Sequence, residues 1–216
     1  MPLDQKTILD AVKQAKEKSK KRNFDQSIEL ILNLKDIDMK SPEGKLQETV
    51  DLPHSPAKQN KICIIASGEL ALKAKKTNAD SVIEKAELEG LAGKKRELRK
   101  IAGDYDFFIA EAPLMPLVGK ILGPVLGPRG KMPMPVPPSA DIASLIEKHR
   151  KTVIVRMRSQ PILQCRIGSE SMKDEEIAEN IQAVLRAVEG RLKRGEKNIK
   201  LVHIKTSMGE TVNIKP

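Results

Sequence analysis

The sequence predicts a two-domain protein of mixed α/β and α+β class: a split α+β domain, with an antiparallel sheet and helices, carrying an inserted Rossmann-like parallel α/β domain. Near both ends of the chain, short stretches alternate apolar and polar residues, as strands do when one face is buried. Between them lie unbroken apolar strands separated by helical patterns, which is typical of a parallel sheet covered by helices. We place the split domain at residues 1–60 and 156–216 and the insertion at residues 61–155.

The first part of the split domain begins with a helix. Asp4 is a candidate cap, and four apolar residues recur on one helical face: Ile8, Ala11, Val12 and Ala15. A basic cluster over 16–22 follows, and then a strand over 27–34 in which every second residue is apolar. The polar face of this strand is open to a ligand. A second strand over 49–52 stops at Pro53.

The inserted domain begins with the apolar run 62–66, which ends at Ser67 and Gly68. An unbroken run of this kind predicts a strand buried on both faces. The pattern then predicts helices near 70–76, 94–101 and 142–149, and strands near 81–83 and 106–110.

The alternating pattern returns after residue 152, with strands predicted over 153–158 and 162–167. A helix follows, with Ser171 as its cap and acidic residues at 174–176 in its first turn, where negative charge favours a helix start. A hairpin of strands over 201–206 and 211–214 ends the domain.

The charge balance indicates a polyanionic partner. The 39 Lys and Arg residues outnumber the 29 Asp and Glu residues, which gives a formal charge of +10. A membrane surface fits less well, because the basic residues are not gathered on one amphipathic helix. Aromatic residues make up only 2% of the chain, so we expect an RNA partner to be recognised through phosphates, sugars and shape rather than by base stacking.

No pattern predicts a metal site, a cofactor or a membrane segment. The two cysteines and three histidines lie far apart, so Cys63 and Cys165 are interpreted as core residues. No apolar run is long enough for a membrane span, and Asp4 and Lys6 stand where a signal peptide would be apolar. We therefore expect a cytoplasmic protein.

The stretch 113–138 holds 8 of the 14 prolines and 4 of the 13 glycines. A nucleotide-binding interpretation fails, because the phosphate-loop and dinucleotide patterns both need glycine at position 125, which is Val125. Two interpretations stay open. The stretch is either a stiff, irregular path attached through Leu122, Val125 and Leu126, or an edge where Arg129 and Lys131 meet RNA phosphate.

Four segments, in order, resemble the archaeal type of the ribosomal protein L1 family. They are RNFDQSIE at 22–29, LPH at 52–54, GKILGPVLGPRGKMP at 119–133 and KTSMG at 205–209. The resemblance covers almost the whole chain. Two departures stand out: Ser207 replaces the usual threonine, and Glu210 replaces the usual proline or lysine. We expect Glu210 to point away from phosphate.

The resemblance implies a cytoplasmic, non-enzymatic ribosomal protein that is a monomer when free. It implies that the split domain binds large-subunit ribosomal RNA at the mobile stalk beside the tRNA exit site and assists tRNA movement and release. It also implies repression of translation through binding to the protein's own mRNA. The implied RNA contacts are Phe24, Ser27, Glu29, Gly168, Thr206, Ser207, Met208 and Gly209, with possible phosphate contacts at Lys21, Arg22, Arg129 and Lys131.

Each of these residues has an ordinary alternative. Phe24 could be a core residue at a helix end, and the strand face and hairpin turn could simply be solvated. The basic runs 16–22 and 94–100 could be solvated helix faces. Two rival functions also remain: a nucleotide-dependent enzyme, and nonspecific coating of nucleic acid by charge alone.

Overall fold

The computed structural model describes residues 4–39, 41, 44, 46–56, 58–77 and 79–214. The chain separates into two compact units, one formed by residues 1–59 and 151–216 and the other by residues 60–150. Mixed α/β architecture is confirmed: one unit contains an antiparallel sheet and the other a parallel sheet.

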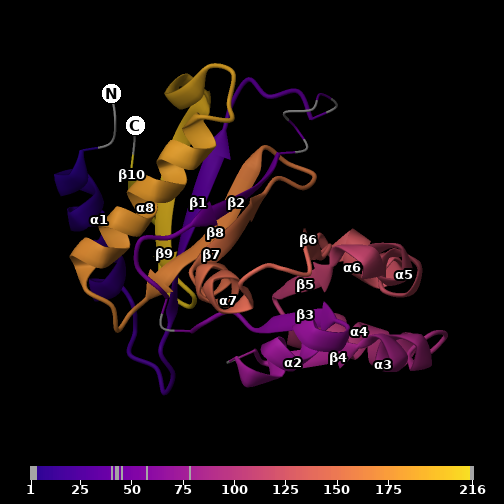
Figure 1. The fold of residues 1–216 in the computed structure, drawn as a ribbon. Coiled ribbons are helices and arrows are strands. Elements are labelled where there is room, and N and C mark those ends of the chain that lie inside the picture. The colour runs from indigo at the N-terminus through magenta and orange to yellow at the C-terminus, as the bar shows by residue number, and fades with distance from the viewer. Residues whose placement is uncertain are drawn as a thin grey trace. The chain divides into compact units, whose positions relative to one another are not determined.

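The first unit is built on a four-stranded antiparallel sheet in the order β10-β9-β1-β8. Its strands are β1 (Ser27–Leu34), β8 (Ile162–Ser169), β9 (Ile199–Thr206) and β10 (Val212–Ile214). Helices α1 (Gln5–Glu17) and α8 (Asp174–Glu189) lie side by side against it (Figure 1).

Strict alternation in β1 determines which face of the sheet meets these helices. Ile28, Leu30, Leu32 and Leu34 are buried, while the residues between them are half-exposed. The predicted apolar face of α1 is buried in the same core. Lys16 Nζ joins the two helices, because it lies 2.7 Å from an Asp174 carboxylate oxygen and donates to the Met172 carbonyl at 2.6 Å.

A small antiparallel ribbon in the first unit lies before the chain enters the second unit and directly after it returns. It pairs β2 (Gln47–Asp51) with β7 (Thr152–Arg156), and the Thr152 hydroxyl donates to Asp51 at 2.7 Å. Beyond β2, the fully buried Asn180 of α8 holds the chain at His54. Its amide donates to the His54 carbonyl and its oxygen accepts from the His54 N–H, both at 3.0 Å.

The second unit is built on a parallel sheet in the order β4-β3-β5-β6. Its strands are β3 (Ile62–Ala66), β4 (Ser81–Glu84), β5 (Phe107–Glu111) and β6 (Met134–Val136). Alternate residues of β3 enter two separate cores: Cys63 and Ile65 lie in one, and Ile62 and Ile64 in the other. This explains why the run 62–66 is apolar throughout.

Six helices accompany this sheet within the described residues. They are α2 (Gly68–Lys76), α3 (Lys85–Gly90), α4 (Lys95–Asp104), α5 (Met115–Ile121), α6 (Gly123–Arg129) and α7 (Ile142–Arg150). The sequence pattern did not predict α3, because Leu88 is the only buried residue in its six-residue span.

The Gly/Pro stretch is not the irregular path of the first of the two interpretations, although Leu122 and Leu126 do attach it to the core. Most of it forms α5, α6 and β6, and Leu122 and Leu126 are fully buried beneath it. Prolines lie in the first turn of both helices, where a missing N–H costs no intrahelical bond. Gly130 ends α6 in the left-handed conformation at φ 68°.

The predicted cap of α8 is also wrong. Lys173 occupies the cap position, and its side chain makes no capping bond. Ser171 instead bonds to Asp25: its N–H donates at 3.2 Å and its hydroxyl at 2.8 Å. The serine therefore fixes the loop before β1 rather than the start of the helix.

Candidate nucleic-acid interface

Three chain segments meet at one end of the antiparallel sheet. The register places Ile28 of β1 opposite Gly168 of β8 on one side and opposite Thr206 of β9 on the other. The next residue along, Ser207, donates its N–H to the Ser27 carbonyl at 3.0 Å. Residues distant in sequence thus form one continuous edge, which we call the sheet-end surface (residues 21–29 and 205–210).

Gln26 holds this surface together. Although polar, it is fully buried. Its amide donates to Ser19 Oγ at 2.8 Å and to the Lys20 carbonyl at 3.0 Å, and its Oε1 accepts the Met208 N–H at 3.1 Å. The sequence alone did not reveal this residue, since a glutamine before a strand resembles any exposed polar residue.

The turn after β9 is fixed by its own packing. Thr206 is fully buried and its hydroxyl donates to Ser19 Oγ at 3.1 Å, so its side chain points into the protein. The Gly209 N–H donates to the Thr206 carbonyl at 3.2 Å, and a Cβ at Gly209 would collide with Thr206 Oγ1. Both residues therefore shape the turn, and the Thr206 side chain is not available to a ligand.

Gly168 is likewise a packing residue. It is buried, and a Cβ there would lie 3.2 Å from both Ile177 Cγ1 and Met172 Sδ. Its role is to let α8 approach the sheet closely.

Two large apolar side chains project from the sheet-end surface. Phe24 is 56% exposed and Met208 is 61% exposed. Phe24 is therefore not the core residue of the alternative interpretation. The hydroxyl of Ser207 lies beside Met208, donates to the Ser27 carbonyl at 3.3 Å and keeps its lone pairs free to accept a bond.

Glu29 lies on the half-exposed face of β1, as the alternation predicts. Its carboxylate accepts a bond from Gln164 Nε2 at 2.9 Å, and its cross-strand partners are Arg166 on β8 and Lys205 on β9. A carboxylate between two cationic strand neighbours is less repulsive to an approaching anion than an isolated one.

The candidate phosphate contacts differ in what they can reach. Lys21 and Arg22 are exposed beside Phe24, with no ion pair among the described residues. Lys131 belongs to the second unit, is 23% exposed, and donates to the Tyr105 carbonyl at 2.6 Å and the Ala102 carbonyl at 3.3 Å. Its ammonium group is therefore occupied within its own unit. Arg129, also in the second unit, is exposed.

The end of the parallel sheet does not fit the phosphate of a bound nucleotide. Glu111 at the end of β5 is 8% exposed, and its carboxylate accepts bonds from the Ser67 N–H at 2.8 Å and the Ser67 hydroxyl at 2.7 Å. Ser67 caps α2, where a phosphate would bind in a nucleotide site. The Glu111 carboxylate therefore already accepts from the Ser67 N–H and hydroxyl, the donors that a bound phosphate would need.

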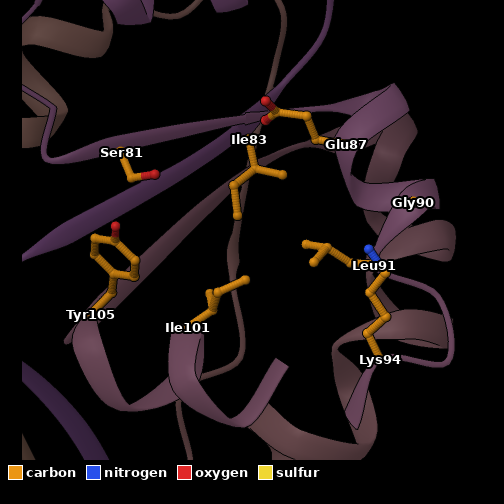
Figure 2. Close-up of a pocket in the computed structure, with 8 residues that line it drawn as sticks. All are labelled: Ser81, Ile83, Glu87, Gly90, Leu91, Lys94, Ile101 and Tyr105. Atoms are coloured by element: carbon orange, nitrogen blue, oxygen red, sulfur yellow. The ribbon is translucent and has the colours of Figure 1, made fainter. Parts of the chain in front are cut away.

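A hollow of about 450 Å³ in the second unit offers no catalytic set either. Figure 2 shows Ser81, Glu87, Lys94 and Tyr105 spread around it, with apolar Ile83, Leu91 and Ile101 between them. Glu87 is committed to the capping box of α3, where its carboxylate accepts the Glu84 N–H. Across the described residues, no group of three or more His, Cys, Asp or Glu side chains could hold a metal ion.

Both cysteines are buried free thiols, as predicted. Burial raises the pKa of Cys63 from 9.0 to about 12, partly offset by a hydrogen bond with Ser81. Burial also raises the pKa of Cys165 to about 12, with a further contribution from the charge of Glu29. No helix in the described ranges has the length and apolar character that crossing a membrane requires.

Comparison with known proteins gives full-length matches. The family model described as ribosomal protein L1p/L10e matches residues 15–210. The chain is 50% identical to the large ribosomal subunit protein uL1 of Pyrococcus abyssi over 216 residues, covering 100% of this chain and 98% of the relative. It is 48% identical to uL1 of Methanothermobacter thermautotrophicus over 97% of this chain and 99% of that one. For uL1 of Methanocaldococcus jannaschii the identity is 47%, with 99% and 97% covered.

Proposed function

Because the chain belongs to the ribosomal protein L1p/L10e family, a family of structural proteins and not enzymes, we propose that it is a cytoplasmic constituent of the large ribosomal subunit. Its partner is ribosomal RNA at the mobile stalk near the tRNA exit site, where it assists tRNA movement and release. The free protein is a monomer.

The observation that supports this proposal best is the sheet-end surface. Phe24 and Met208 are large apolar side chains exposed on two segments that the buried Gln26 ties together. Exposed apolar groups on a rigid frame, beside the Ser207 hydroxyl oxygen that can accept a bond, suit the packed riboses and bases of a prefolded RNA.

Specificity and attraction come from different residues in this proposal. Ser207, Met208 and Glu29 contact the RNA, and Glu29 accepts a bond from a base amino group or a 2′-hydroxyl. Lys21 and Arg22 supply attraction to phosphate, supported by the net charge of +10. Thr206, Gly168 and Gly209 act indirectly, by shaping the frame.

The same surface also serves a regulatory function. An RNA fold in the protein's own message that resembles the stalk RNA would occupy the identical residues and repress translation. Binding of the two RNAs is then mutually exclusive, which a competition assay with both RNAs measures.

The site is tested by titrating the stalk RNA with Ser207→Val and Met208→Ala proteins. Each change should weaken binding by about 1–3 kcal/mol, the scale of one well-placed contact. Met134→Ala is the matched control, because Met134 is 49% exposed but lies in the second unit. Wild-type affinity in both site variants would reject the site.

Salt separates specific binding from coating by charge alone. Charge-only binding falls steeply and equally for every RNA sequence as salt rises. We expect the preference for stalk RNA over an unrelated structured RNA to persist at high salt, and its loss would favour coating.

A further inference from the structure

A groove of about 570 Å³ lies in the second unit, between α4 and the helix pair α5–α6. We call it the basic groove. Its lining lies wholly within residues 92–129 and includes no residue of the sheet-end surface, and its volume is in the range of ligand clefts. Of the candidate RNA contacts, Arg129 alone lines it.

Part of the lining of the basic groove is apolar, and we call this part the floor. It is formed by Leu98, Ile121, Pro124, Val125 and Pro128. Leu98 is buried, whereas Ile121 and Val125 are only partly covered by the core beneath them. Apolar surface that lines a groove gains from being covered by apolar side chains of a partner.

The charged part of the lining is cationic, and we call this part the rim. It is formed by Lys95, Arg99, Lys120 and Arg129, and no acidic residue lines the groove. Within the described part of the chain, Lys95, Arg99 and Lys120 form no ion pair. Arg129 makes only a long bond of 3.5 Å to the Arg99 carbonyl. The lining therefore combines positive charge that no ion pair balances with an apolar part.

The helices that form one wall carry glycines that the fold does not need. Gly119, Gly123 and Gly127 recur at four-residue spacing, and a Cβ at each would meet no described atom within 4 Å. None has positive φ. Glycine costs about 1 kcal/mol relative to alanine inside a helix. These positions leave part of the α5–α6 surface without side chains, although none of the three glycines lines the groove itself.

We propose that the basic groove binds an acidic peptide segment of another protein, one that places aliphatic side chains on the floor and Asp or Glu side chains against the rim. RNA fits less well: its phosphates would match the rim but leave the apolar floor uncovered. No aromatic ring lines the groove to stack a base.

The probe is a synthetic fluorescent helical peptide of about four turns, with leucines spaced i, i+3, i+4 and i+7 and glutamates on the flanking positions. Binding is measured by fluorescence anisotropy with the full-length protein. A second peptide, with serine in place of each leucine, keeps the charge and loses the apolar face. We expect the first peptide to bind and the second to bind at least about tenfold more weakly.

Matched protein variants locate the site. Lys95→Glu/Arg99→Glu changes the rim, and Arg96→Glu/Lys100→Glu makes the same charge change on the same helix outside the groove. The rim variant should bind the leucine peptide at least about tenfold more weakly than the wild type does. The control variant should lose no more than about twofold in affinity. Ile121→Ser/Val125→Ser should also weaken it, with circular dichroism confirming that each variant folds.

Three results would overturn the proposal. They are equal losses in the rim and control variants, equal binding of the leucine and serine peptides, and no binding of the leucine peptide. A short single-stranded RNA serves as competitor. The groove is an RNA site instead if two results occur together. The rim variant, but not the control variant, must bind this RNA more weakly, and the RNA must displace the leucine peptide at a lower concentration than unlabelled leucine peptide does. None of these results affects the sheet-end surface, because stalk-RNA binding is measured separately.

Discussion

The buried oxygen Oε1 of Gln26 accepts the backbone N–H of Met208 at 3.1 Å, although the two residues are 182 positions apart in sequence. This bond connects the loop before β1 to the turn after β9. It places the most exposed apolar side chain of the turn on a frame that the core supports, because Gln26 itself is fully buried.

Removing this bond should loosen the sheet-end surface. Gln26→Ala leaves the Met208 N–H and the Lys20 carbonyl without their side-chain partner, so the free energy of unfolding should fall by about 1–3 kcal/mol. Urea denaturation measures it, and stalk-RNA affinity should fall in the same variant. Gln160→Ala, at an exposed turn position, is the control and should change neither quantity. Equal stability of the two variants would show that Gln26 does not hold the turn.

Glycine is required at position 209 and not at position 127. Gly209→Ala forces a Cβ against Thr206 Oγ1, so its melting temperature and RNA affinity should both fall. Gly127→Ala adds a Cβ that meets no described atom within 4 Å and should be neutral or stabilising by up to about 1 kcal/mol. Thermal unfolding of the pair checks this, and an unchanged melting temperature in Gly209→Ala would contradict the turn geometry.

The two buried cysteines should make the free energy of unfolding fall as the pH becomes alkaline. Both thiols have a pKa of about 12 in the folded protein against an ordinary value of 9.0, so above pH 9 the unfolded chain loses protons that the folded chain keeps. The stabilisation is complete below pH 9 and is lost as pH rises towards 12. Urea titrations over this pH window should show that the free energy of unfolding falls less steeply with pH in the Cys63→Ala/Cys165→Ala variant than in the wild type. Identical slopes would mean that the thiols titrate normally.

Two groups of cations should behave in opposite ways. Lys131→Ala removes an ammonium group that donates to two carbonyls of its own unit, so it should lower stability and leave stalk-RNA binding unchanged. Lys21→Ala/Arg22→Ala should keep stability and reduce the salt dependence of binding, with the slope falling by roughly one for each phosphate that these side chains neutralise. An unchanged slope in the second variant would remove these residues from the interface.

Much of the fold could be predicted from periodicity. The alternation in β1 and the unbroken run in β3 correctly indicated one sheet with a single core and another with two. Periodicity failed where few residues are buried, as in α3, and where composition misled, as in α5 and α6. Proline at a first helical turn and proline in a loop look alike until the register is known.

Most of the candidate site could be predicted only through the family resemblance, although the alternation in β1 already placed Ser27 and Glu29 on its polar face. That resemblance identified Phe24 and Met208, which are exposed at one end of the sheet, and Ser207, which is half-exposed there. It did not separate them from Thr206 and Gly168, which are buried, because burial depends on α1 and α8 packing across the sheet. Gln26 left no signal, since its partners are mainly backbone groups and their positions follow from the tertiary fold.

The central claim is that residues 21–29 and 205–210 together bind the stalk RNA. Amide hydrogen exchange of the full-length protein, with and without a saturating amount of that RNA, tests it most directly. We predict slower exchange in both segments on binding, with unchanged exchange in α5 and α6. Unchanged exchange in both segments, with protection confined to the second unit, would contradict the claim.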